Sequence, residues 1–387
     1  MIPYGRQDIG ESDIEAVVTV LKSDWLTQGP TVPRFEKAVA DYCCAQYGVA
    51  VSNATAALHI ACLALEVGPG DIVWTSANTF VASANCALYC GATVNFVDID
   101  PRTYNMSVEG LREKLVRAES AGCLPKVVIP VHFAGQSCEM REIGALGERY
   151  GFKIIEDASH AIGASYLGEP VGNCRYSDIV VFSFHPVKII TTAEGGMAMT
   201  NDPVLDDRLR LFRSHGITRD EGKMPLPMDG PWSYQQIELG FNYRMTDLQA
   251  ALGVSQMTRL VDFCQTRRAF AHKYDEALRG LSLQLPWQHP DTQSSFHLYP
   301  ILARDSKTNR LDVFEQLRSK GVGVAVHYIP VHLQPQYRKA GFKPGDFPVA
   351  EQYYAETLSL PMFSSMTQAD IHHVVLALSE VLPAEKK

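Results

Sequence analysis

The chain has 387 residues, of which 46% are hydrophobic and 20% charged, and its formal net charge is −8. This composition is typical of a globular enzyme with room for two domains. The negative charge argues against a nucleic-acid partner, which usually needs a basic surface. Without an apolar leader or a run of roughly 18 apolar residues, we expect a cytoplasmic protein with no membrane span. Nine cysteines and twelve histidines lack metal-site spacing, which predicts reduced thiols and no metal.

The first predicted element is a helix that starts near residue 12. Ser12 and Glu15 have the spacing of a capping box. Apolar residues at positions 14, 17, 18 and 21 then follow one face of a helix. The Gln-Gly-Pro sequence at 28–30 ends this pattern and predicts a loop.

Short apolar strands alternate with helices from about residue 49. We predict strands at 49–51, 71–74, 93–97, 127–131, 153–155, 179–184 and 197–200, and helices at 55–65, 80–89, 109–117 and 142–150. This alternation is typical of an α/β fold with a mostly parallel sheet and helices on both faces. Such sheets place sites beyond the carboxyl ends of their strands. His132, Asp157 and Ser183 all follow strand ends and should therefore lie at one edge.

A long helical stretch at 247–278 should connect this large domain to a smaller one. The C-terminal pattern is mixed, with strands at 298–302 and 322–326 and helices at 312–320 and 368–381. We predict a large domain at 1–250 and, at 251–387, a linker helix with a small C-terminal α+β domain.

A candidate phosphate site lies where the first strand gives way to a helix. Small residues at Ala54 and Ala56 permit close approach of an anion to the helix N-terminus, and Thr55 can donate from its hydroxyl. The alternative is that Asn53 or Thr55 only caps the helix.

Two polar residues have the arrangement that pyridoxal phosphate chemistry requires. Lys188 can bind an aldehyde, and Asp157, after a buried strand, can keep a pyridine nitrogen protonated. His160 lies one helical turn beyond Asp157 and could orient it or contact the cofactor. Ser183 can donate to a phosphate, and His185 is better explained as a pocket wall. Each residue alone has an ordinary structural explanation as a cap, a core residue or a surface lysine.

Several segments, taken in chain order, resemble one known family. They are 54–58, 79–85, 97–100, 130–136, 156–158, 184–188 and 240–247. With them the chain resembles the DegT/DnrJ/EryC1/StrS sugar aminotransferases, from residue 2 to residue 362. The resemblance implies fold type I of the pyridoxal phosphate transferases, with a large domain around a mostly parallel sheet flanked by helices.

The resemblance also implies roles for individual residues. Lys188 and Asp157 are the catalytic pair, and the other expected cofactor contacts are Ala54, Thr55, Ala56, Phe80, His160, Ser183 and Asn242. Phe80 would cover the ring, and Asn242 would reach the phosphate of the other subunit in a homodimer. The residues that match substrate-lining segments are Tyr4, Asp24, Trp25, Leu26, Thr27, His327, Tyr328, Ile329 and Pro330. Ala54 departs from the family, where glycine is common, and fits if its φ is negative.

Segments 157–164 and 184–188 are most similar to family members of pseudaminic acid synthesis. They imply transfer of an amino group from L-glutamate to C4 of a UDP-linked 4-keto-6-deoxy-N-acetylhexosamine. Members that make bacillosamine- or perosamine-type sugars share the same catalytic residues and stay as alternatives, because stereochemistry is set by pocket shape.

Three other classes fit less well. A sugar dehydratase of the same family has histidine where this chain has Lys188. A nicotinamide dehydrogenase needs G-x-G-x-x-G after the first strand, where this chain has Ser-Asn-Ala-Thr. A non-catalytic cofactor-binding regulator would leave Lys188, Asp157 and Ser183 without a use.

Overall fold

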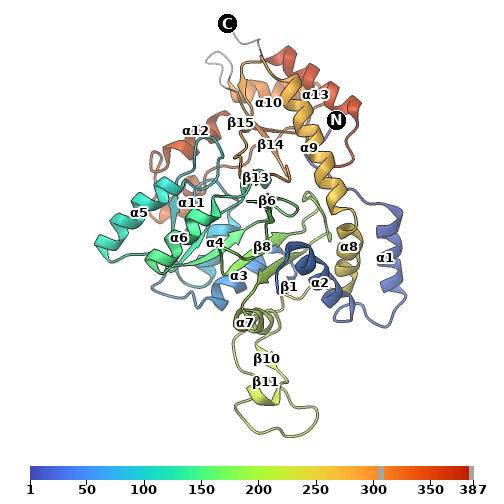
Figure 1. Ribbon diagram of the computed structural model, residues 1–387, viewed down its shortest axis with the longest axis vertical. Coiled ribbons are helices and arrows are strands. Elements are labelled where there is room, and N and C mark those ends of the chain that lie inside the picture. The colour runs from blue at the N-terminus through green and yellow to red at the C-terminus, as the bar shows by residue number, and fades with distance from the viewer. Residues whose placement is uncertain (304–308, 383–387) are drawn as a thin grey trace.

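A seven-stranded sheet forms the centre of the computed structural model, which describes residues 1–303 and 309–382 (Figure 1). Its strand order is β1-β9-β8-β5-β4-β2-β3. The strands are β1 (Tyr47–Val51), β2 (Ile72–Ser76), β3 (Thr93–Val97), β4 (Val127–Ile129), β5 (Lys153–Asp157), β8 (Ile179–Ser183) and β9 (Gly196–Thr200). From β8 to β3 neighbouring strands are parallel, whereas β9 runs antiparallel to β8 and β1. The predicted mostly parallel sheet is confirmed.

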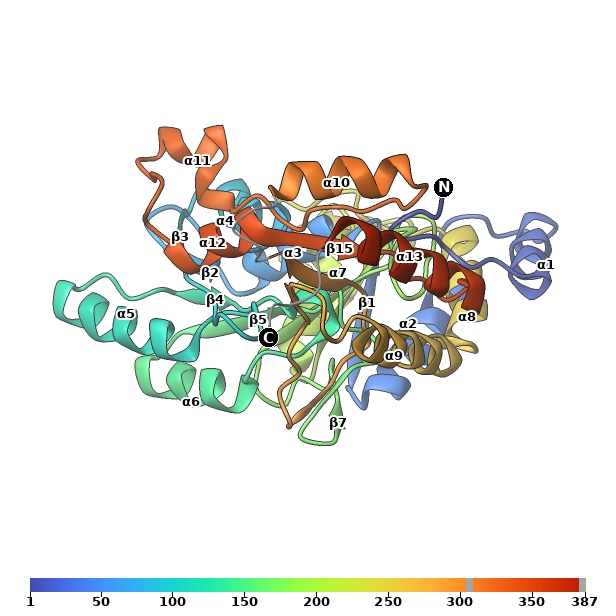
Figure 2. The same ribbon diagram turned by 90° about the horizontal axis from the view of Figure 1, so that it is seen from above.

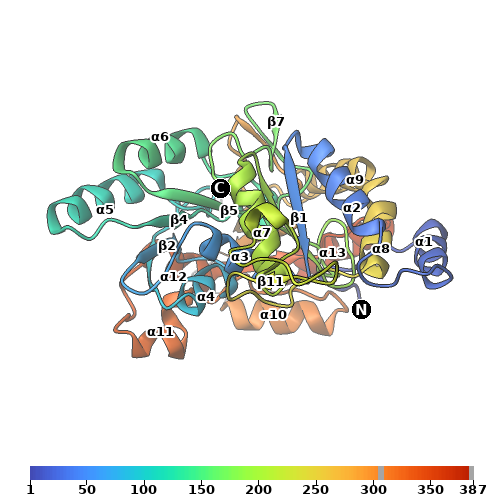
Figure 3. The same ribbon diagram turned by 90° about the horizontal axis from the view of Figure 1, so that it is seen from below.

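Helices cover both faces of this sheet. One face carries α3 (Ala54–Ala64), α4 (Ala82–Tyr89) and α7 (Pro203–Arg213), and the other carries α2 (Thr31–Cys43), α5 (Val108–Ala121) and α6 (Met140–Tyr150). Alternate residues of one strand serve the two faces: Val49 and Val51 are buried with α3, and Ala50 with α2. Figures 2 and 3 show α5 and α6 side by side beyond the sheet.

The C-terminal elements form a second core at the upper end of Figure 1. They are the sheet β12 (Leu283–Gln284), β14 (Tyr299–Ala303) and β15 (Thr357–Leu360), with α9 (Leu260–Ala277), α10 (Arg310–Ser319) and α13 (Gln368–Val381). The predicted helix at 247–278 is two helices, α8 (Asp247–Met257) and α9, with a break at Thr258 and Arg259. The domain boundary at 250/251, which falls within α8, stays a prediction.

The predicted strand at 322–326 is wrong. Within the described residues this segment makes two isolated bridges, from Val322 to Ile2 and from Ala325 to Ser359. Gly323 passes so close to the N-terminal segment that an added Cβ would lie 2.7 Å from the carbonyl oxygen of Ile2. The segment therefore passes from the N-terminal residues to β15 and does not pair along either of them as a strand.

The cap of the first helix lies two residues before its predicted position at Ser12. In α1 (Glu11–Leu21) the N-cap is Gly10, and Asp13 accepts a 2.9 Å hydrogen bond from the Gly10 N–H. The predicted Ser12–Glu15 capping box is thus wrong. The apolar face exists but is largely exposed, with Ile14 at 48% and Leu21 at 56%. Packing of α1 on α8 instead buries Asp13, which pairs with Arg259.

The remaining elements are small. They are β6 (Ser165–Tyr166), β7 (Glu169–Pro170), β10 (Ile217–Thr218), β11 (Gln235–Gln236), β13 (Thr292–Gln293), α11 (Pro335–Lys339), α12 (Pro348–Glu356) and three 3-10 turns at Phe133–Gly135, Glu221–Lys223 and Val331–Leu333. The β10–β11 hairpin projects from the body of the molecule (Figure 1). Among the described residues, the helices are all too short or too polar to cross a membrane.

Candidate active site

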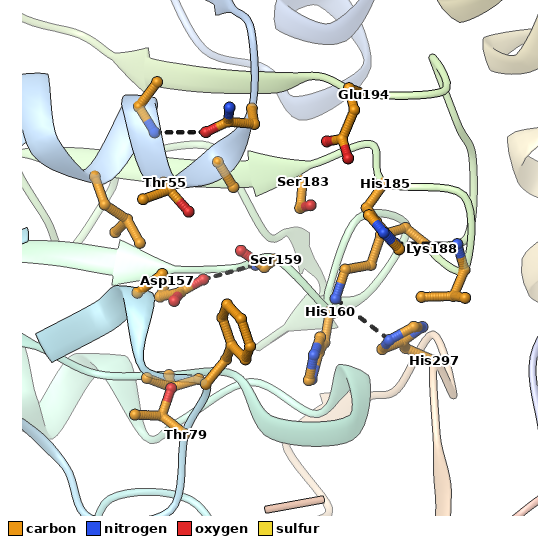
Figure 4. A pocket seen from close by; sticks show the side chains of 18 of the residues that line it. Thr55, Thr79, Asp157, Ser159, His160, Ser183, His185, Lys188, Glu194 and His297 are labelled. Atoms are coloured by element: carbon orange, nitrogen blue, oxygen red, sulfur yellow. Dashed lines mark hydrogen bonds between the residues drawn. The ribbon is translucent and has the colours of Figure 1, made fainter. Parts of the chain in front are cut away.

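A cavity of about 730 Å³ opens at the carboxyl ends of β5 and β8. It brings together eleven of the predicted site residues: Tyr4, Ala54, Thr55, Ala56, Phe80, Asp157, His160, Ser183, Lys188, His327 and Tyr328. In Figure 4 the side chains of Thr55, Ser183, Asp157 and Lys188 surround one common space. The prediction that polar groups after the strands would meet at one edge of the sheet is confirmed for Asp157 and Ser183.

The other predicted residues are outside the lining that the described residues form. Residues 24–27 are exposed on the loop between α1 and α2, and Ile329 is 45% exposed. Pro330 is buried beside the cavity residues His327 and Tyr328. Asn242 is exposed and pairs with Ser214 next to the β10–β11 hairpin. Their roles in binding stay predictions.

Lys188 lies on the connection between β8 and β9. Its backbone N–H donates a 2.9 Å hydrogen bond to the His185 carbonyl, and the Thr192 N–H closes the loop onto the Phe184 carbonyl at 3.0 Å. Burial lowers the pKa of Lys188 from its usual 10.5 to about 8, and the nearby Asp157 carboxylate offsets part of that effect. A substantial fraction of this amine is therefore neutral near pH 7 to 8, as a nucleophile or base requires.

Asp157 ends β5 with both carboxylate oxygens bonded. Ser83 on α4 donates to Oδ2 at 2.6 Å, and the Ser159 N–H donates to Oδ1 at 3.1 Å. The main chain of Asp157 is fixed as well, because its carbonyl accepts from the His132 N–H at 3.0 Å. These hydrogen bonds hold the Asp157 side chain in a fixed direction.

His160 bonds to Ala134 and Tyr328. Its Nδ1 accepts from the Ala134 N–H at 3.3 Å, so the neutral ring carries its proton on Nε2, which lies 3.1 Å from the Tyr328 hydroxyl. Burial, followed by the charge of Lys188, keeps the pKa of His160 well below its usual value. The ring is neutral and links the β5 loop to Tyr328. The Asp157 oxygens are bonded to Ser83 and Ser159 and not to His160, and the contact of His160 with the cofactor stays a prediction.

The start of α3, where the sequence predicts an anion site, shows the helix cap that was the alternative, and the anion site stays a prediction. Asn53 is the N-cap, and its Oδ1 accepts from the Ala56 N–H at 2.8 Å. The N–H groups of Ala54 and Thr55 stand in the first turn, where a helix offers no internal acceptor. Ala54 is helical, with no positive φ, so alanine fits where many relatives have glycine. Gly196 on β9 passes so close that an added Cβ would lie 2.6 Å from Ala54 N.

The structure adds residues that the sequence did not single out for the site. Ser83 lies within the quoted segment 79–85 and is identified by its bond to Asp157. His297 lies on the chain segment between β13 and β14, 109 positions from Lys188, yet its Nε2 is 3.5 Å from Lys188 Nζ (Figure 4). His185, predicted as a pocket wall, lines the cavity as well. Other lining residues are Asn53, Leu58, His59, Thr79, Ala82, Tyr89, Val131, Ser159, Val187, Glu194 and Tyr243.

These groups fit pyridoxal phosphate. The α3 N-terminus with Thr55 and Ser183 suits a phosphate, Asp157 suits a pyridinium nitrogen, and Lys188 suits an aldehyde. Phe80 presents a 57% exposed side chain at the cavity. The fold and this set of side chains define a pyridoxal phosphate-dependent enzyme.

The chain belongs to the DegT/DnrJ/EryC1/StrS aminotransferase family, whose sequence profile matches residues 7–379. It is 38% identical to the spore coat polysaccharide biosynthesis protein SpsC of Bacillus subtilis, over 98% of this chain and 97% of that protein.

Two solved structures are similar over nearly the whole chain. Helicobacter pylori PseC, an aminotransferase involved in the biosynthesis of pseudaminic acid, has a TM-score of 0.89 at 29% identity, with 98% of each chain covered. The sugar aminotransferase Spr1654 of Streptococcus pneumoniae, described as putative, has a TM-score of 0.88 in its PLP form at 29% identity, again with 98% coverage of both chains. The protein is therefore a pyridoxal phosphate-dependent sugar aminotransferase.

Proposed function

We propose that this enzyme transfers the amino group of L-glutamate to C4 of UDP-2-acetamido-2,6-dideoxy-β-L-arabino-hex-4-ulose. The products are 2-oxoglutarate and UDP-4-amino-4,6-dideoxy-N-acetyl-β-L-altrosamine, a precursor for pseudaminic acid. The observation that carries the proposal is the position of the Lys188 amine in one cavity with Asp157 and the α3 N-terminus. The choice of sugar is supported by segments 157–164 and 184–188 and by the similarity to PseC.

Lys188 moves protons in this proposal. When bound, pyridoxal phosphate supplies an aldehyde that exchanges amines and a ring that takes up electrons from the carbon losing its proton. Released Lys188 takes the Cα proton of glutamate at Nζ and later returns a proton, and the same residue works in reverse on the sugar. Its pKa of about 8 suits both directions near neutral pH.

In this proposal the start of α3, Asp157 and Ser183 hold the cofactor in place. Asp157, whose oxygens are fixed by Ser83 and Ser159, would pair with the pyridine nitrogen and favour a positive charge on it. Thr55 and Ser183 would hold the phosphate at the other end of the cofactor. Tyr4, His327 and Tyr328 line the same cavity and would contact the sugar. Because the two substrates use one site in turn, we expect ping-pong kinetics.

We further propose a homodimer in the cytoplasm. Asn242 is exposed beside a projecting hairpin that also exposes Leu226, Trp232 and Leu239, and α1 exposes an apolar face. Exposed apolar groups of this kind suit a subunit interface. Asn242 would then reach the phosphate in the partner's cavity. The cysteines of the described residues are free, which suits a reducing compartment.

The visible absorption of the cofactor-loaded protein tests this proposal. L-Glutamate should remove the band of the lysine-bound cofactor, and the UDP-4-keto-6-deoxy-N-acetylhexosamine should restore it. The 4-keto precursors of bacillosamine- and perosamine-type sugars serve as competing acceptors, and mass spectrometry identifies the amino sugar formed. Loss of the band with glutamate but recovery only with another 4-keto sugar would contradict the proposed acceptor and keep the class of reaction.

A further inference from the structure

His297 contacts Lys188 from the C-terminal part of the chain, and the proposed function gives it no task. Hydrogen bonds with α9, with the 3-10 turn at Phe133–Gly135 and with the loop after β5 hold the chain segment that carries His297. Nη1 of the buried Arg267 on α9 donates to the carbonyls of Phe296, at 3.2 Å, and His297, at 3.4 Å. Ser295 N–H donates to the Gly135 carbonyl at 3.1 Å, and Ser295 Oγ to the His160 carbonyl at 3.0 Å. The His297 ring is thus positioned against the end of the central sheet.

Gly135 is required for this close approach. It has φ +99°, and an added Cβ would lie 2.6 Å from Ser295 Oγ and 3.0 Å from the His297 N atom. Phe296, next to His297, adopts a left-handed φ of 47°, which is unusual for a large residue. Backbone strain of this kind persists where the surroundings fix it, and it is often found at functional sites.

The His297 ring has one nitrogen engaged and one without a partner. Nε2 lies 3.5 Å from Lys188 Nζ, at the outer limit of a hydrogen bond, so the amine is held and still free to leave. Nδ1 is buried and has no hydrogen-bond partner among the described residues. A buried nitrogen without a hydrogen-bond partner destabilises the folded protein. A histidine that stands beside the reactive amine in spite of this cost points to a functional role for its ring.

Burial makes the His297 ring neutral. Burial, then the positive charge of the nearby Lys188, keeps the pKa of His297 well below its usual value. A neutral ring beside an amine can accept a hydrogen bond from that amine. Figure 4 shows His297 and His160 on the same side of Lys188. The centroids of the two rings are 4.4 Å apart. Because His160 is already bonded to Ala134 and Tyr328, His297 is the histidine with a nitrogen to spare for Lys188.

We propose that His297 is a positioning residue for Lys188: Nε2 accepts a hydrogen bond from Nζ and holds the released amine in line with the reacting carbon. The hydrogen bond is strongest after Lys188 has taken a proton, because charge-assisted bonds exceed neutral ones. His297 itself neither gains nor loses a proton in the reaction. This inference rests on the proposed function, in which Lys188 moves the proton.

The test measures Lys188 without the cofactor and compares three substitutions. His297→Gln places an acceptor near the position of Nε2, His297→Asn has an amide too short to reach Nζ, and His297→Met fills the space without an acceptor. The rate of reductive methylation of Lys188 by formaldehyde is followed from about pH 6 to about pH 10 by peptide mass spectrometry. Loss of the acceptor should lower the apparent pKa of Lys188 by roughly half a unit to one unit in Asn and Met variants. In the Gln variant the apparent pKa of Lys188 should stay near the wild-type value.

Loaded enzyme supplies a second readout. With His297→Asn and His297→Met, kcat for glutamate should fall about tenfold with little change in cofactor retention, and His297→Gln should recover most of it. Equal pKa values of Lys188 in the wild type and all three variants, measured on proteins with matching thermal unfolding, would overturn the inference. Failure of the unsubstituted protein to bind pyridoxal phosphate at Lys188 would instead overturn the proposed function. The methylation rates would still measure the contact between His297 and Lys188.

Discussion

Ser83 donates a 2.6 Å hydrogen bond to Oδ2 of Asp157 and so joins α4 to the carboxyl end of β5. Ser83 is fully buried and also lies 2.8 Å from the Thr79 hydroxyl. A serine on the helix that follows β2 thereby fixes the carboxylate that follows β5. The direction of Asp157 depends on two segments far apart in the sequence, and this relationship gives the first prediction.

Asp157→Asn should lower kcat by roughly a hundredfold or more, because a neutral amide does not keep a pyridine nitrogen charged. Ser83→Ala should lower kcat by only about tenfold, since Asp157 keeps its carboxylate and the hydrogen bond from Ser159. Steady-state kinetics with both substrates and equilibrium dialysis of the cofactor measure the two effects. Near-normal turnover in Asp157→Asn would refute the role assigned to Asp157.

The burial of Lys188 predicts a pH-dependent difference in stability. Its pKa is lowered from 10.5 unfolded to about 8 folded, so between these values the unfolded chain binds more protons. The apo protein should therefore gain stability relative to Lys188→Met as the pH rises through this window. The gain is about 2 kcal/mol after allowance for exposure toward the cavity. Denaturant unfolding of both proteins near pH 7 and pH 10 measures it, and a constant difference would show that the pKa is not lowered.

Gly196→Ala should disturb the anion site, because the new Cβ would lie 2.6 Å from Ala54 N. We expect cofactor affinity to fall at least about tenfold and stability to fall by about 1–3 kcal/mol. Gly68→Ala is the matched control, since an added Cβ at Gly68 meets nothing within 4 Å. Titration of each apo protein with pyridoxal phosphate compares them. Equal affinities would argue against a phosphate at the start of α3.

Mixed dimers test whether Asn242 serves the partner's cavity. Lys188→Ala and Asn242→Ala homodimers should both be poorly active. In a mixed dimer one site has Lys188 from one chain and Asn242 from the other, so equal mixing should restore about one quarter of the wild-type activity. Activity measured after the two proteins are unfolded and refolded together gives the result. No recovery in dimers of proven mixed composition would place Asn242 in its own chain's site or outside any site.

Much of the central sheet could be predicted because its strands are buried on both faces and are therefore short, continuous apolar runs. The helix Thr31–Cys43 was not assigned, although its Pro33 stands in the first turn, where proline is tolerated. The exposure of the α1 face could not be predicted, since periodicity marks an apolar stripe and not what covers it.

The site also has a part that the sequence predicts and a part that it does not. Asp157 ends β5 and Lys188 follows β8, and the pairing of these two strands brings the residues together. His297 comes from a segment outside that sheet, and its contact with Lys188 depends on Arg267 and Gly135, which hold the main chain. Such a contact between separate parts of a chain leaves no local pattern in the sequence.

Borohydride trapping tests the central claim most directly. The purified protein is loaded with pyridoxal phosphate, reduced and digested, and the modified peptide is identified by mass spectrometry. We predict a phosphopyridoxyl group on Lys188, and protection of Lys188 when L-glutamate is added before reduction. The exposed Lys153, paired with Asp178 at the far end of β5, serves as the internal control. Modification spread over surface lysines with Lys188 unmodified would contradict the account.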